Sequence, residues 1–209
     1  MNKAEELKKR KIVAVIRGAQ PNQILPIAQA LKEGGISAFE ITVESPDVCN
    51  SIAKLKEEFG NEIFIGAGTV LDPETARSVI MAGAEFIFSP TVNVETIKMT
   101  KRYGVLSIPG ALTPTEILTA YEHGGDIIKV FPADVLGIAY FKSLLGPLSQ
   151  IPLMPTGGVN LDNIKNYFKT GAVAAGIGNS LVNPSNLNSE KDYINLTKKA
   201  KQFSSIILN

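Results

Sequence analysis

Lys129 lies inside an apolar run, IIKVF at residues 127–131, and is the strongest candidate in the chain for covalent chemistry. Burial disfavours the charged ammonium form of a lysine and lowers its pKa, which supplies the free amine that attacks a carbonyl carbon. The position of Lys129 therefore predicts a nucleophile that forms a Schiff base. The alternative is a lysine that points outward between helices or extends its ammonium group to the rim, and the strand pattern alone does not decide between them.

Glu40 is a second charge within an apolar run, and no oppositely charged residue adjoins it in the sequence. If Glu40 and Lys129 face one interior, each favours the charged form of the other while burial opposes it, so that the two titrate as a pair. We predict that Glu40 moves protons as a general acid and base. The alternative is a structural ion pair with Lys129 or Arg17.

Eight apolar runs alternate with amphipathic segments and recur roughly every 20 to 26 residues, the length of one βα unit with its loops. The segments between them follow the helical period, as Ile24, Ile27, Ala28 and Leu31 do. The predicted strands lie within residues 11–18, 38–44, 63–70, 85–90, 105–111, 126–133, 152–159 and 172–181.

Regular βα units without a linker predict a single (β/α)8 TIM barrel that spans residues 1–209 as one domain. Residues 1–10 are expected to form a short helix that caps the bottom of the barrel. Residues 183–192 are expected to be a loop before a C-terminal helix. An open doubly wound sheet is the alternative, although no GxGxxG motif opens the first helix.

Polar residues collect where the predicted strands end, which is where the active site of a TIM barrel lies. The glycine-rich loops after the last two strands are typical of a phosphate cradle, so we expect an anionic tail on the substrate. Alternatively, these glycines serve the turns only. The strand-end and loop candidates are Arg17, Glu40, Thr42, Thr69, Lys129, Thr156, Gly157, Gly158, Gly178, Asn179 and Ser180.

The composition argues against several classes of binding partner. Lys and Arg number 21 against 20 for Asp and Glu, so no charge excess attracts nucleic acid or anionic lipid. No apolar stretch approaches the roughly 20 residues that span a bilayer, and we expect a cytoplasmic protein. With one cysteine, Cys49, and one histidine, His123, we expect no disulfide, no metal and no other cofactor.

Eight different strand-end motifs follow one another along almost the whole chain. In order, they are KIVAVIRG, FEIT, IGAGTV, FSP, PGALTPTE, IKVFPAD, PTGGVNLDN and IGNSLV. In these motifs the chain resembles the class I aldolases that cleave 2-keto-3-deoxy-6-phosphogluconate (KDPG) and 4-hydroxy-2-oxoglutarate (KHG). The resemblance implies a carbon-carbon lyase that acts on a small 2-keto acid without a cofactor, as a homotrimer.

The resemblance also implies a role for each matching residue. Lys129 matches the Schiff-base lysine and Glu40 the proton-transfer glutamate, while Arg17 and Thr69 would bind the pyruvyl carboxylate. Thr156 would lie near the reacting carbons and Phe131 would form an apolar wall. The distal phosphate or carboxylate would be bound by Gly157, Gly158, Gly178, Asn179 and Ser180.

Two positions depart from the family pattern. Some members carry the carboxylate-binding arginine where this chain has Glu44, and we expect Arg17 to deliver the same charge from a neighbouring strand. Asn179 stands where several members have a smaller residue, which leaves the preferred aldehyde open. The alternatives are an aldolase for a related 2-keto-3-deoxy sugar acid, another phosphate-binding barrel enzyme such as a thiamine phosphate synthase-like protein, and a non-catalytic phosphosugar-binding barrel.

Overall fold

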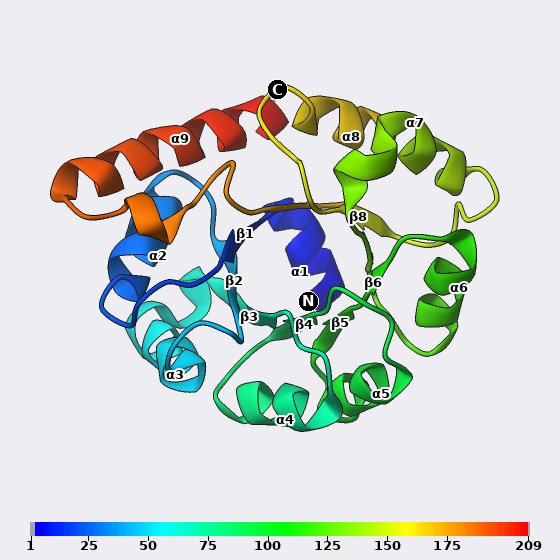
Figure 1. The fold of residues 1–209 in the computed structure, drawn as a ribbon, viewed down its shortest axis with the longest axis horizontal. Helices are drawn as coiled ribbons and strands as arrows, with labels where there is room; N and C mark the ends of the chain where they lie inside the picture. Colours follow the sequence, from blue (N-terminus) through cyan, green and yellow to red (C-terminus); the bar gives the residue numbers. More distant parts are fainter. Residues whose placement is uncertain (1–2, 209) are drawn as a thin grey trace.

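The computed structural model describes residues 3–208, which fold into parallel β-sheet surrounded by α-helices (Figure 1). The strands are β1 (Ile12–Ile16), β2 (Ala38–Thr42), β3 (Phe64–Gly68), β4 (Phe86–Phe88), β5 (Leu106–Ile108), β6 (Gly110–Ala111), β7 (Ile128–Val130), β8 (Leu153–Pro155) and β9 (Ala175–Ile177). The helices are α1 (Lys3–Arg10), α2 (Ile24–Glu33), α3 (Val48–Phe59), α4 (Pro73–Met81), α5 (Val94–Arg102), α6 (Pro114–Glu122), α7 (Ala133–Leu145), α8 (Ile164–Thr170) and α9 (Glu190–Leu208), with short 3-10 turns at Gly60–Glu62 and Pro184–Asn186.

The strands pair in parallel in two sheets, a six-stranded one in the order β5-β4-β3-β2-β1-β9 and a three-stranded one in the order β6-β7-β8. Pro109, which has no N–H group to donate, separates β5 from β6 within the fifth predicted strand. The carbonyl of Pro109 still accepts from the N–H of Lys129 at 2.9 Å. At the other edge, a bridge between Thr156 and Gly176 links the end of β8 to β9.

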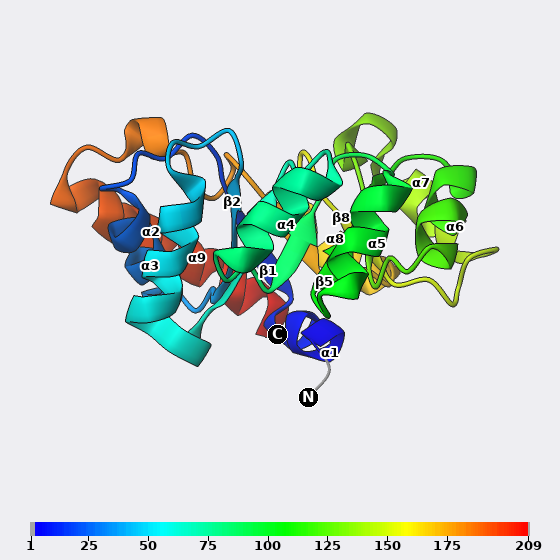
Figure 2. The ribbon, with the colours of Figure 1, turned by 90° about the horizontal axis from the view of Figure 1, so that it is seen from below.

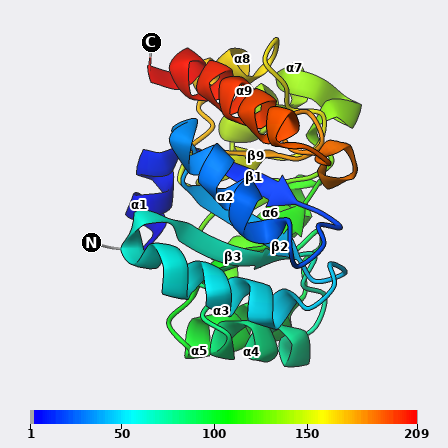
Figure 3. The same ribbon diagram turned by 90° about the vertical axis from the view of Figure 1, so that its left-hand side faces the viewer.

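The inward side chains at the N-terminal ends of the strands form an apolar cluster that includes Phe64, Phe86 and Phe88. The rings of Phe64 and Phe86 stack with their centroids 5.3 Å apart. Helix α1 lies across this end of the strands, and its Ala4 and Leu7 join the cluster (Figures 2 and 3). The predicted capping helix is thus present, and it closes the bottom of the sheet assembly.

Capping residues mark the starts of several helices. The side chain of Asp72 accepts from the N–H of Thr75, and Thr113 forms a capping box with Glu116. Asn163 is the N-cap of α8, but its side chain does not cap the helix. Asn163 instead binds the loop before it, because its side chain accepts from the N–H of Asn160 and donates to Gly158 O.

The stretch 183–192 differs from the predicted loop. It contains the 3-10 turn Pro184–Asn186, and α9 begins at Glu190. Asp192 explains the early start, since its carboxylate accepts from the N–H groups of Asn188 and Ser189. Within residues 3–208, no helix combines the length and the apolar character needed to cross a membrane.

Candidate active site

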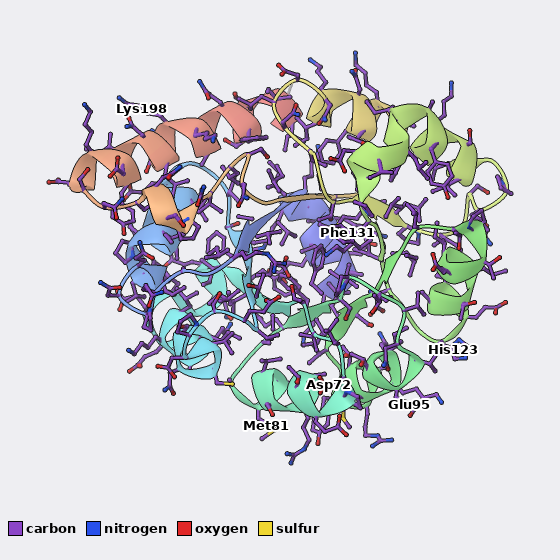
Figure 4. All side chains as sticks on the ribbon, viewed as in Figure 1. Asp72, Met81, Glu95, His123, Phe131 and Lys198 are labelled. Carbon is purple, nitrogen blue, oxygen red and sulfur yellow. The ribbon has the colours of Figure 1, made fainter. Side chains whose placement is uncertain are left out.

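A cavity of about 550 Å³ opens at the C-terminal ends of the strands. Every residue to which the family resemblance assigned a role lines this cavity, and these residues come from six different strand ends. These residues are Arg17, Glu40, Thr69, Lys129, Phe131, Thr156, Gly157, Gly158, Gly178, Asn179 and Ser180. Figure 4 shows Phe131 over the central space, while His123 lies at the periphery.

The cavity lies directly above the apolar cluster, because side chains alternate along a strand and residues two apart share a face. On each of five strands, a cluster residue is followed two positions later by a residue of the cavity wall. These pairs are Val13 and Val15, Ala38 and Glu40, Ile127 and Lys129, Met154 and Thr156, and Ala174 and Gly176. Lys129 therefore faces the interior, which settles the orientation that the strand pattern left open.

Lys129 is 6% exposed, and its ammonium nitrogen lies over two aromatic rings. Nζ is 4.4 Å from the ring centroid of Phe88 and 4.6 Å from that of Phe131. These rings offer the cation a weak electrostatic attraction but no hydrogen bond. These ring contacts leave the lone pair of the neutral amine free to attack a carbonyl carbon.

Glu40 is 2% exposed, and among the described residues its Oε2 has no hydrogen-bond partner. Gly68 makes room for this carboxylate, since a Cβ at Gly68 would overlap Oε2. A Cβ at Gly66 would likewise overlap the ring of Phe86. The glycines of the GAGT motif thus clear space for a buried carboxylate and for the aromatic packing beneath it.

Burial favours the uncharged forms of both Glu40 and Lys129. Desolvation raises the pKa of Glu40 to about 7, although the positive charges of Lys129 and Arg17 oppose the rise. Desolvation lowers the pKa of Lys129 to about 8, the Glu40 charge opposing the fall and Arg17 adding to it. A proton exchanged within the pair therefore costs little free energy near neutral pH, as acid and base catalysis requires.

Arg17 lies at the cavity rim between the ends of three neighbouring strands. Its Nη1 forms an ion pair with Glu44 Oε1 at 2.9 Å, and its Nη2 donates to Thr69 Oγ1 at 2.9 Å. Thr69 has a φ of +57°, in the left-handed region that a β-branched residue seldom adopts. The family resemblance implied a shared role for Arg17 and Thr69, but the sequence did not predict that Glu44 would bind the arginine.

The loops after β8 and β9 face each other across the cavity mouth. Gly157 and Gly158 have φ values of +91° and +68°, and a Cβ at Gly158 would overlap Asp134 at the start of α7. A single turn follows the last strand, and in it the N–H groups of Leu181 and Val182 donate to Gly178 O. The N–H groups at the start of such a turn have no carbonyl one turn earlier and can serve an anion.

Two hydroxyl groups in these loops, those of Ser180 and Thr156, differ in whether they already donate a hydrogen bond within the protein. Ser180 Oγ donates to Val159 O, so its hydrogen ties the two loops together and does not point to a ligand. Thr156 Oγ1 is buried and has no partner among the described residues. A Cβ at Gly176 would overlap this oxygen. The free donor at the centre of the site is thus Thr156, whereas Ser180 braces its rim.

The cavity wall also contains residues that sequence reasoning missed, namely Val15, Pro90, Val159, Asn160 and Gly176. Alternation could have identified Val15, which precedes Arg17 by two positions on the same face. The side chain of Asn160 holds its own loop together, because its Oδ1 accepts from the N–H of Asp162 and its Nδ2 donates to Gly158 O.

Thr42, His123 and Cys49 lie outside the cavity wall. Thr42 is fully buried, and its hydroxyl lies 3.4 Å from that of Ser45. His123 is the C-cap of α6, and its Nδ1 is 2.8 Å from Thr119 O. Cys49 is half-buried against the outer core. No group of three or more His, Cys, Asp or Glu residues in the described range 3–208 has a metal-binding arrangement.

Comparison with known proteins shows the family of the chain. A model of the KDPG and KHG aldolase family matches residues 4–198. The chain is 32% identical over 204 residues to a 2-dehydro-3-deoxy-phosphogluconate aldolase of Treponema pallidum (strain Nichols), covering 97% of this chain and 96% of that one. It is 34% identical over 171 residues to a 2-dehydro-3-deoxy-6-phosphogalactonate aldolase of Escherichia coli (strain K12), covering 81% and 83%.

A solved structure has the same fold over nearly its whole length. The crystal structure of the KDPG aldolase from Legionella pneumophila, with pyruvate captured at low pH as a covalent carbinolamine intermediate, superimposes with a TM-score of 0.88. It is 27% identical in sequence, and the match covers 96% of this chain and 97% of that one.

Proposed function

Since the chain belongs to the KDPG and KHG aldolase family and is an aldolase, a lyase, we propose that Lys129 is the nucleophile that forms a Schiff base with a small 2-keto acid. The observation that carries this proposal is the amine of Lys129 in an apolar wall, with a lowered pKa and a buried carboxylate facing the same cavity. The favoured substrate is KDPG, KHG or both.

We further propose that the two sheets form one closed (β/α)8 barrel. Two observations support closure: the hydrogen bond from Lys129 to Pro109 and the bridge between Thr156 and Gly176. Such a barrel places every strand end around one mouth, which accounts for a site assembled from residues far apart in the sequence.

The proposed cycle begins when the neutral Nζ of Lys129 attacks the C2 carbonyl carbon and forms a carbinolamine. Glu40 gives a proton to the departing hydroxyl, and water leaves as the iminium forms. A base then removes the C4 hydroxyl proton, the C3–C4 bond breaks, and its electron pair moves into the iminium to give an enamine. The aldehyde departs, C3 takes up a proton, and water hydrolyses the iminium to release pyruvate and Lys129.

The remaining cavity residues fit the two ends of such a substrate. Arg17 and Thr69 supply donors at one side for the carboxylate next to the keto group. Phe131 covers the reacting carbons with an apolar face, and Thr156 Oγ1 has a free hydrogen for a substrate oxygen. The turn at residues 178–182 and the loop at residues 156–158 would receive the phosphate of KDPG or the distal carboxylate of KHG.

A second candidate substrate is the C4 epimer of KDPG, because the relative from Escherichia coli is named for 2-dehydro-3-deoxy-6-phosphogalactonate. Cleavage rates measured on both epimers and on KHG would identify the preferred aldehyde. In line with the family resemblance, we propose a cytoplasmic homotrimer. Sedimentation velocity of the purified protein would test the oligomeric state.

Incubation with pyruvate and borohydride, followed by peptide mapping, tests the central proposal. We expect irreversible labelling at Lys129 alone, and none in Lys129→Met, whose side chain has a similar length without the amine. Labelling at another lysine, or aldol cleavage retained by Lys129→Met, would overturn covalent catalysis at this residue. A chelator should leave the cleavage rate unchanged, whereas a rate restored by added divalent cation would indicate a metal-dependent aldolase.

A further inference from the structure

Glu44 holds Arg17 from outside the cavity. Its Oε1 lies 2.9 Å from Arg17 Nη1, while Arg17 Nη2 donates to Thr69 Oγ1 on the cavity side. Arg17 and Thr69 belong to the cavity wall, and Glu44 is not one of its residues. The side chains of Arg17 and Glu44 are 55% and 49% exposed, so neither is fixed by burial.

The backbone that carries Glu44 is itself fastened to the neighbouring strand ends. Ser45 Oγ accepts from the N–H of Gly18 at 2.9 Å, and Ser45 N–H donates to Thr42 O at 2.9 Å. On the other side of Glu44, Val43 N–H donates to Gly68 O at 2.9 Å. Glu44 therefore presents its carboxylate from a short, well-anchored segment beside the rim.

On the basis of the proposed function, we propose that Glu44 is a positioning residue for the substrate carboxylate. By holding the guanidinium of Arg17 against Thr69, Glu44 directs the N–H donors that remain free on Arg17 toward the carboxylate next to the keto group. A guanidinium has five N–H donors, and the contacts to Glu44 and Thr69 occupy two of them.

Two opposing effects decide how Glu44 changes binding. An exposed arginine samples many rotamers, and a ligand that must order it loses affinity, so a residue that orders it beforehand strengthens binding. Against this, the negative charge of Glu44 repels a carboxylate. Solvent screens this repulsion because Glu44 is half-exposed, and the guanidinium that Glu44 contacts compensates its charge. Preorganisation therefore outweighs repulsion at this rim.

The experiment measures borohydride trapping at increasing concentrations of pyruvate and of methyl pyruvate, which keeps the keto group but lacks the carboxylate charge. For Glu44→Ala we expect the half-saturating pyruvate concentration to rise about fivefold, while the maximal trapping rate stays within about twofold. The half-saturating concentration of methyl pyruvate should not change. Glu44→Gln retains an oxygen that accepts from Arg17, so its effect on pyruvate should be smaller.

Glu95→Ala is the matched control, because Glu95 pairs with Lys98 at 2.8 Å on the outer helix α5 and should leave both half-saturating concentrations unchanged. An unchanged or lower half-saturating pyruvate concentration in Glu44→Ala would overturn the inference. An equal rise for pyruvate and methyl pyruvate would also overturn it, since that result indicates a general structural role. Failure of the wild-type protein to be labelled at Lys129 would instead reject the proposed function on which the inference depends.

Discussion

Lys129 and Glu40 share one buried environment that moves the pKa values of both groups toward neutral pH. Each would be fully charged in water near neutral pH, and burial penalises each charge. Their mutual attraction recovers part of that penalty, so the pKa of Glu40 is about 7 and that of Lys129 about 8. Both protonation states of the pair are therefore accessible, which an acid-base partner of an amine nucleophile requires.

The pH dependence of kcat/KM for aldol cleavage should reveal this pair. Because only the neutral amine attacks the keto group, kcat/KM should rise through the pKa of Lys129 and level off above about 8. Glu40→Gln removes an anion that raises the pKa of Lys129, so the midpoint of the residual activity should move to lower pH. Its turnover should fall by roughly two to four orders of magnitude. A wild-type midpoint near 10.5, the value of a free lysine, would contradict this description of Lys129.

At the level of single elements, the strand ends and the loops that follow them determine what the site can hold. The third strand carries glycine where its neighbours carry large side chains, so the carboxylate from β2 fits against it. The loops after β8 and β9 are joined by the hydrogen bond from Ser180 to Val159. Gly68 thus leaves room for the carboxylate of Glu40. The bond from Ser180 to Val159 holds the two loops together at the cavity mouth.

Gly68→Ala tests the space that β3 provides. The added Cβ would overlap Glu40 Oε2 and displace the carboxylate, so kcat should fall by roughly two orders of magnitude or more, toward the level of Glu40→Gln. Gly146→Ala is the control, because its Cβ would meet only Ser143 O at 3.6 Å, an ordinary contact. Steady-state kinetics on both variants decide the matter, and a near-normal kcat in Gly68→Ala would show that Glu40 can act from elsewhere.

Ser180→Ala tests the link between the two loops. Losing this donor leaves Val159 O unsatisfied and frees the loops to move apart, so KM for KDPG should rise about tenfold. KM for the shorter, unphosphorylated KHG should change much less. Ser143→Ala, which removes a comparable hydroxyl-to-carbonyl bond on α7, should change neither value. Equal increases for both substrates would mean that Ser180 shapes the whole site rather than its distal end.

Across the whole molecule, the two ends of the strand assembly have opposite packing. The N-terminal ends are filled by phenylalanine rings and sealed by α1, while glycines and short side chains leave a cavity at the C-terminal ends. The stability of the sealed end can therefore support a hollow and polar end, where buried charges cost free energy. The proposed catalytic residues thus lie at the opposite end of the strands from the apolar cluster.

Leu7→Ala should lower stability without a direct effect on catalysis. Leu7 is fully buried in the apolar cluster beneath the site, so its truncation should reduce the free energy of unfolding by about 2–5 kcal/mol. Leu25→Ala on α2, where the side chain is 36% exposed, is the matched control and should cost much less. Urea denaturation followed by circular dichroism measures both values, and equal losses would show that α1 does not seal the interior.

The sequence alone predicts the order of the βα units, the capping helix, and most of the residues that line the cavity. These follow from local rules, because hydrophobic period and punctuation identify strands and helices, and strand ends in such a fold share one mouth. Alternation also explains why Lys129 and Glu40 lie two positions beyond residues of the apolar cluster.

The three-dimensional structure was needed to show which way Lys129 points and why Gly68 must lack a side chain. It was also needed to show that Glu44 binds Arg17 and that Ser180 binds Val159. Each of these is a contact between segments separated by at least 20 residues in the chain. Periodicity describes one element at a time, whereas such contacts depend on the register between strands and on the paths of the loops. The chemistry of single residues was therefore readable from the sequence, and their partnerships were not.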